Sequence, residues 1–143
     1  MSEKKANPVP QGKYVPATRF GDLVVTAGMT PRKNGALIQT GRVLKDEALE
    51  TYKEAVRQAA DNALTAARNQ LAEDECIVRV MSMTVYVNAE DGFTAHAKIA
   101  DFASDYLNEE LGDASPMARV SIGVATLPGN APVEIQLMCG VGK

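Results

Sequence analysis

Two charged side chains, Arg119 and Glu134, stand in sequence that otherwise reads as buried strand. The segment 118–136 is ARVSIGVATLPGNAPVEIQ, in which alternating Val and Ile residues predict two strands joined at Pro128-Gly129-Asn130. A charge inside such a hairpin is costly unless it is paired or solvated. The two residues are therefore either a structural ion pair, solvated surface groups, or the charged part of a functional site.

The spacing of Arg119 and Glu134 decides where they can meet. If Leu127 and Pro132 pair across the loop, Glu134 lies opposite Ala125. At ~3.3 Å per residue, Arg119 is then roughly 20 Å along the ladder from Glu134. A joint site is accordingly predicted at an interface between two copies of the chain.

The chain has few residues of the other types that commonly bind metals or act as catalysts. His96 is the only histidine, and Cys76 and Cys139 are isolated. We expect two small buried thiols, no metal site and no histidine-based triad. His96 is expected to be a packing or surface residue.

Composition bounds the class of protein. The 143 residues suffice for one domain, with a loose arm at residues 1–13 and the folded part at residues 14–143. The net charge of −3 and the absence of a basic stripe argue against nucleic acid as a partner. The first residues lack an apolar signal-like run and no stretch is long enough to span a bilayer, so we expect no membrane partner and a cytoplasmic location.

Periodicity predicts seven elements. Glu47–Ala72 is the clearest helix, with Asp46 as its N-cap, and Gly112 is expected to end a second helix. The predicted order is strand 22–28, an Asn34-Gly35 turn, strand 36–38, helix 47–72, strand 79–88, helix 91–110, and the final hairpin. This β-β-α-β-α-β-β order favours an α+β domain with two helices on one face of a mixed sheet.

The strand at 79–88 is apolar on both faces. One side is predicted to carry Val80, Ser82, Thr84 and Tyr86, and the other Met81, Met83, Val85 and Val87. Since two helices can cover only one face, the other face is expected to be buried by further copies of the chain.

With these residues in view, the chain resembles the reactive-intermediate deaminase family, the RidA-like or YjgF-like proteins, from about Gly12 to Cys139. The resemblance is carried by GKYVPAT (12–18), GDLVVTAGMTP (21–31), VYVNAEDGF (85–93) and, most specifically, ARVSIGVATLPGNAPVEI (118–135). It is closest to a less characterised branch of the family. It implies a chorismate-mutase-like fold assembled as a homotrimer, with the sheets forming a central barrel and three clefts between subunits.

The resemblance also implies an activity, the hydrolysis of reactive 2-imino or enamine acids to 2-keto acids and ammonia without a cofactor. By this similarity Arg119 clamps the substrate carboxylate, Glu134 orients the attacking water, and Tyr14 closes over the substrate. Ala27, Gly28 and Ser121 are the remaining substrate-binding positions.

Two of these positions depart from the family pattern. Val120 and Ser121 follow the arginine where the family usually has Ser and often Cys, and Ala27 replaces a serine. Because a site built to bind a substrate group discriminates strongly when the partner is missing, the preferred substrate is expected to differ.

Three functions remain open. The first is the deaminase, the second a non-catalytic protein that binds small carboxylate metabolites in the same cleft, and the third a ribonuclease or translation inhibitor. The acidic composition and the single histidine place the third last.

Overall fold

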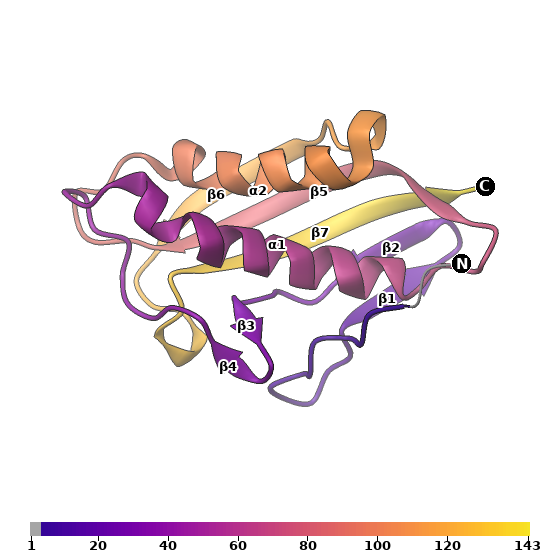
Figure 1. Ribbon diagram of the computed structural model, residues 1–143, viewed down its shortest axis with the longest axis horizontal. Helices are drawn as coiled ribbons and strands as arrows, with labels where there is room; N and C mark the ends of the chain where they lie inside the picture. The colour runs from indigo at the N-terminus through magenta and orange to yellow at the C-terminus, as the bar shows by residue number, and fades with distance from the viewer. Residues whose placement is uncertain (1–3) are drawn as a thin grey trace.

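Two helices lie side by side on one face of a mixed sheet in the computed structural model, which describes residues 4–143 (Figure 1). The elements are β1 (Ala17–Phe20), β2 (Leu23–Thr26), β3 (Arg32–Lys33), β4 (Ala36–Leu37), η1 (Leu49–Tyr52), α1 (Lys53–Arg68), β5 (Cys76–Asn88), α2 (His96–Leu111), η2 (Gly112–Ala114), β6 (Ala118–Val124), η3 (Pro128–Asn130) and β7 (Val133–Gly142). The predicted α+β class, with both helices on one face, is confirmed.

The sheet corrects the predicted final hairpin. Its strand order is β1-β2-β7-β5-β6, so β5 lies between β6 and β7, parallel to β6 and antiparallel to β7. The connection through η3 is long enough to cross the end of β5, and both edges of that long apolar strand are then hydrogen-bonded. The two strands are adjacent in the sequence but do not pair, so the prediction that Glu134 lies opposite Ala125 is wrong. Glu134 lies opposite Tyr86 instead.

The beginning of the chain contains two strands more than predicted, β1 and β3. β1 pairs with β2 across Gly21-Asp22, where Gly21 has a φ of 60°. The turn predicted at Asn34-Gly35 is confirmed, and both residues have positive φ, as a tight turn requires. The strands expected on its two sides are wrong in part, because β4 pairs with β3 in a separate small sheet while β2 pairs with β1 and β7.

Small side chains let α1 pack closely on the sheet. The face of α1 predicted from the alanine spacing is buried, and so is the inner face of α2. Fully buried on these helices are Val56, Ala59, Ala60, Ala63, Leu64, Ala67, Ile99, Ala100, Ala103 and Leu107. Gly112, at a φ of 55°, ends α2 as predicted.

Both helices begin later than predicted. Helix α1 is preceded by the 3-10 turn η1, and neither η1 nor α1 has a side-chain cap, so the prediction of Asp46 as N-cap is wrong. Helix α2 begins at His96 because residues 91–95 form a turn in which the Phe93 amide donates to the Glu90 carbonyl and the Phe93 ring is buried.

The face of the sheet opposite the helices is uncovered. The register of β5 shifts between Val80 and Ser82, so Val80 faces the helices while Met81 is 51% exposed on the other face, the reverse of the prediction for these two residues. Val78 and Met81 lie over Gly142 and Gly140, which leave room for them. The exposed apolar side chains of this open face are Phe20, Leu23, Val78, Met81, Val120, Ile122 and Met138.

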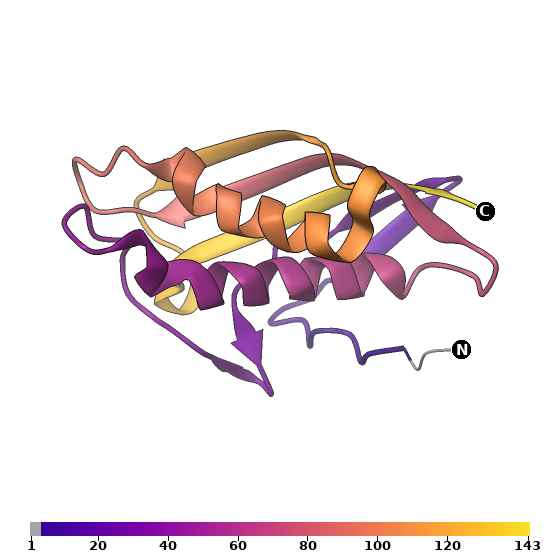
Figure 2. The same cartoon turned by 45° about the horizontal axis from the view of Figure 1, so that its top comes forward.

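Both ends of the described chain lie at the same end of the molecule (Figure 2). Within residues 4–143, neither helix combines the length and the hydropathy needed to cross a membrane.

Candidate functional site

Glu134 is the one carboxylate on the open face of β7. Its neighbours Val133 and Ile135 are fully buried on the helix face, so strand alternation directs Glu134 to the other side. The side chain is half-buried, and no cation among residues 4–143 lies within ion-pair distance of it. Burial raises the pKa of this carboxyl group above its ordinary value, since no positive charge offsets the lost hydration.

Gly28 makes room for that carboxylate. A Cβ atom at position 28 would lie 2.5 Å from Glu134 Oε2 and 2.9 Å from its Cδ, so any other residue at this position would force the carboxylate to move. Two backbone hydrogen bonds between Met29 and Ile135, of 2.8 and 2.9 Å, hold this segment against β7. The glycine therefore serves a close approach to the carboxylate and not a special backbone angle.

Ala27 lies at the start of the same segment. Its amide donates to the Pro16 carbonyl at 2.8 Å, and its carbonyl accepts from the Thr26 hydroxyl at 2.8 Å. That hydroxyl also accepts from the Leu137 amide, so Thr26 ties the segment to β7. The methyl group of Ala27 packs against the core, and the structure thus places Ala27, Gly28 and Glu134 together.

Tyr14 and Gly28 line a cavity of about 290 Å³ below the N-terminal arm. The Tyr14 side chain is half-exposed, and its hydroxyl oxygen accepts from the Gln11 amide at 2.9 Å, so the hydroxyl hydrogen remains available to a ligand. Glu134 reaches Gly28 but is not among the residues that line the cavity.

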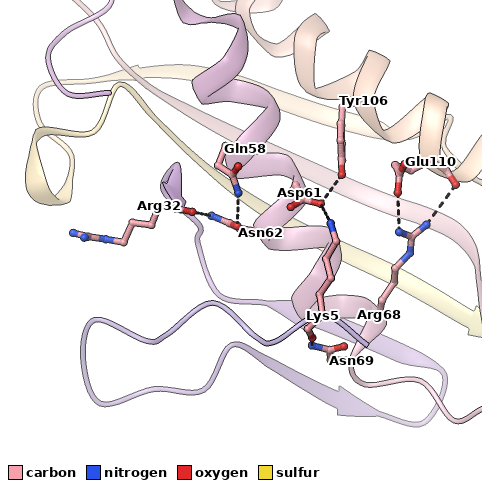
Figure 3. Close-up of polar contacts among 9 residues, drawn as sticks. All are labelled: Lys5, Arg32, Gln58, Asp61, Asn62, Arg68, Asn69, Tyr106 and Glu110. Carbon is pink, nitrogen blue, oxygen red and sulfur yellow. Dashed lines mark hydrogen bonds and ion pairs between the residues drawn. The ribbon is translucent and has the colours of Figure 1, made fainter. Parts of the chain in front are cut away.

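The N-terminal arm lies along α1 over this cavity (Figure 3). Lys5 donates to Asp61 at 3.0 Å, and Asp61 also accepts from the Tyr106 hydroxyl. Burial and the nearby Asp61 raise the pKa of Tyr106, so it remains a donor. The Asn69 amide donates to Lys5 and Asn7, which fixes the arm where it enters the cavity wall.

Asn62 positions the chain after Gly28, and sequence reasoning missed it. Its amide nitrogen donates to the Arg32 carbonyl at 2.8 Å, and its oxygen accepts from Gln58 at 2.9 Å (Figure 3). The same nitrogen donates to the Thr30 carbonyl at 3.0 Å. The signal available was a polar residue within the apolar stripe of the helix, which is rarely buried without partners.

Arg119 and Ser121 lie elsewhere, on β6 at the edge of the sheet. Arg119 pairs with Met83 and Ser121 with Val85, both of which face the helices. Arg119 thus lies on the opposite face of the sheet from Glu134, with β5 between their strands. Within one chain the structure does not bring the predicted clamp and the predicted water-orienting group together.

Arg119 is bound by α2 of its own chain, which the sequence did not reveal. Its Nη1 donates to Ser104 Oγ and pairs with Asp101 Oδ1, each at 2.8 Å, and its Nη2 donates to the Ala97 carbonyl at 2.9 Å. Helical spacing groups positions 97, 101 and 104 on one face. Nothing in sequence spacing shows which strand residue that face meets.

His96 packs against β6 two residues beyond Ser121. Its Nε2 lies 2.7 Å from where a Cβ of Gly123 would stand, and its ring meets Phe93 edge to face at 5.1 Å between centroids. The predicted packing role fits these contacts. Across the described residues, no three His, Cys, Asp or Glu side chains are grouped to hold a metal ion.

These features define an α+β protein whose polar site lies at the uncovered side of a mixed sheet, around a glutamate that packs on a glycine. The chain belongs to the family described as Endoribonuclease L-PSP, whose model matches residues 4–141. The resemblance to RidA-like or YjgF-like proteins is thereby confirmed.

Individual relatives agree with this assignment. A protein of unknown function from Agrobacterium tumefaciens superimposes with a TM-score of 0.82 at 30% identity, covering 94% of this chain and 87% of that one. Protein TCP17 of Trypanosoma cruzi is 26% identical over 130 residues, which are 90% of this chain and 81% of that protein. The structure of E. coli TdcF with bound serine shares the fold, with a TM-score of 0.69, 20% identity, and coverage of 94% and 92%.

Proposed function

We propose that this protein hydrolyses reactive 2-imino or enamine acids to 2-keto acids and ammonia, without a cofactor. The observation that carries the proposal is the Glu134 carboxylate, half-buried over Gly28 with a raised pKa and no cation among residues 4–143 within ion-pair distance. A group in this environment suits a general base, because its pKa moves toward the operating pH. Family membership and the serine bound to TdcF support a small amino-acid-like ligand.

The reaction needs only water and proton transfer. Glu134 takes a proton from the water as its oxygen bonds to C2 of the protonated imine, which gives a carbinolamine. The proton on Glu134 then passes to the nitrogen. The C–N bond breaks as Glu134 takes the hydroxyl proton of the carbinolamine, which leaves ammonia, the 2-keto acid and a protonated Glu134; that proton passes to ammonia or solvent and restores the carboxylate. Holding water beside an electrophile that is already activated supplies much of the rate through orientation.

A second copy of the chain supplies the carboxylate clamp in this proposal. Arg119 and Glu134 of one chain lie on opposite faces of the sheet, so a shared site requires two chains. The exposed apolar side chains of the open face favour association, since a monomer rarely leaves such a patch in water. We propose a homotrimer, with Arg119 of one subunit and Tyr14, Gly28 and Glu134 of its neighbour around each cleft.

The test measures ammonia and keto-acid release from 2-iminobutanoate and 2-iminopropanoate, generated freshly by a threonine or serine dehydratase. Wild-type protein should accelerate release above the protein-free rate, and Arg119→Ala should abolish the acceleration. Arg57→Ala is the matched control, because Arg57 pairs with Glu109 on the outer side of the helices. No acceleration by folded wild-type protein would refute the proposal.

Two other outcomes point to the remaining candidates. Thermal stabilisation by 2-keto acids without turnover would identify a carboxylate-binding protein, because a ligand of the native state stabilises it by mass action. The family description keeps RNA cleavage as the third candidate function. Cleavage of RNA that survives in Glu134→Gln would assign that activity to a different site.

A further inference from the structure

Arg119 meets a preformed set of acceptors on α2. Asp101 and Ser104 both contact Nη1 at 2.8 Å, and the Ala97 carbonyl accepts from Nη2 at 2.9 Å. The acceptors come from one face of a helix whose inner residues are fully buried, so the packing of α2 fixes the Ala97 carbonyl and the points at which Asp101 and Ser104 leave the backbone. The guanidinium is held from one end.

The contacts leave the other edge of the guanidinium open. Of its five N–H groups, three have these partners, while the Nε hydrogen and one Nη2 hydrogen have none among residues 4–143. Nε and Nη2 lie side by side, and such a pair matches the two oxygens of a carboxylate. The Arg119 side chain is only partly buried, so part of it remains accessible to a ligand.

Asp101 contributes charge without taking that edge. Only Oδ1 of Asp101 is within ion-pair distance, it reaches Nη1, and its side chain is 59% exposed against 23% for Arg119. An arginine held in this way has already lost most of its rotamer freedom during folding. Less ordering remains to be done when a carboxylate binds.

We infer that Asp101 and Ser104 are positioning residues that hold the Nε–Nη2 edge of Arg119 ready for a substrate carboxylate. This rests on the proposed role of Arg119 as the clamp. If Asp101 instead competed with the substrate carboxylate for Arg119, removing Asp101 would tighten substrate binding rather than weaken it.

The experiment compares Asp101→Ala and Ser104→Ala with Asp105→Ala. Asp105 is an exposed carboxylate four residues further along the same helix, without a hydrogen bond or ion pair to Arg119, so its removal matches the change in charge. Steady-state kinetics on 2-iminobutanoate are measured together with calorimetric binding of 2-oxobutanoate, which reads carboxylate affinity independently of turnover.

Removing Asp101 should raise KM and the Kd for 2-oxobutanoate roughly threefold to tenfold, the cost of ordering one long side chain, and leave kcat within about twofold. Ser104→Ala should also raise KM and Kd, whereas Asp105→Ala should change neither. In the Arg119→Ala background, the added substitution Asp101→Ala should have no further effect on either constant. A structural role alone would not give this dependence on Arg119.

The outcomes separate this inference from the proposed function. Normal turnover with equal affinities for the Asp101 and Asp105 variants, or tighter binding by Asp101→Ala, overturns the positioning role and leaves the deaminase intact. Absent turnover with weaker binding by Asp101→Ala supports the positioning role and refutes the deaminase. Wild-type protein that binds no 2-oxobutanoate refutes the clamp and the positioning role together.

Discussion

Arg119 and Glu134 occupy the two faces of one sheet and are satisfied to very different degrees. Arg119 has a hydroxyl, a carboxylate and a carbonyl as partners from α2. Glu134 has no cationic partner among residues 4–143 and lies against a glycine, with burial raising its pKa. Packing on α2 would by itself explain Arg119, whereas no ion pair or hydrogen bond within the described part of the chain, residues 4–143, accounts for the Glu134 carboxylate.

The contrast between the two residues identifies Glu134 as a position that lowers the stability of the folded protein. A half-buried carboxylate without a cation costs free energy that a glutamine or an apolar residue at the same place would not. Such a cost is typical of functional sites. Glu134 is accordingly the stronger of the two site assignments, and Arg119 depends on the presence of a second chain.

The largest expected effect is that of Glu134→Gln on turnover. Loss of a general base lowers kcat by about 10²- to 10⁴-fold, because the amide cannot accept the proton from water. The wild-type pH profile of kcat/KM should show an acid limb above the ordinary carboxyl pKa, since burial raises the pKa of Glu134. An acid limb that persists unchanged in the glutamine variant would assign it to another group.

Gly28→Ala should act through the same carboxylate. Gly28 is not among the residues with positive φ, so alanine is compatible with the backbone. Its Cβ, however, would lie 2.5 Å from the present position of Glu134 Oε2 and would push the carboxylate away. A displacement of this size lowers turnover by about 10²-fold. The variant should fold normally by circular dichroism, and combining it with Glu134→Gln should add little. Full additivity of the two losses would contradict a shared origin.

The third prediction concerns what covers the open face. Ile122, Tyr86 and Glu134 form one row across it, with Ile122 exposed. Ile122→Lys should dissociate the proposed trimer in analytical ultracentrifugation and reduce turnover, because a charge would replace apolar surface that another copy is proposed to bury. Ile38→Lys is the control, since Ile38 is similarly exposed but lies outside the sheet. A wild-type monomer would remove the basis for the shared site.

Sequence patterns predicted the helices and strands of this fold better than they predicted which strands pair in the sheet. The alanine stripe of α1 and the positive-φ turn at Asn34-Gly35 are local features, and both are present. The pairing of β6 and β7 was wrong because the strand between them comes from earlier in the chain. Similarly, Arg119 was singled out because it is a charged residue in an otherwise apolar strand. Asp101 was not, because its contact with Arg119 depends on how α2 packs on the sheet.

Glu134→Gln should also affect stability, in the opposite direction to activity. A carboxyl group with a raised folded-state pKa binds more protons folded than unfolded, so wild-type stability falls as pH rises above the ordinary value of 4.5. The glutamine variant lacks this loss. Thermal unfolding should show equal Tm values below about pH 4 and a higher Tm for the variant at pH 7. A less stable variant at pH 7 would mean that a cation pairs with Glu134 in solution.

Glu75 provides the reverse case and the smallest effect. It accepts two hydrogen bonds from Arg19, at 2.6 and 2.7 Å, and this contact lowers the pKa of Glu75 to about 2. Its contribution is present above the ordinary carboxyl pKa and is lost as pH falls toward 2. Glu75→Gln should therefore lower Tm slightly at pH 7, with the difference disappearing in acid. Two glutamates with opposite signs in one protein would show that the loss at Glu134 comes from its missing cation and not from carboxylates in general.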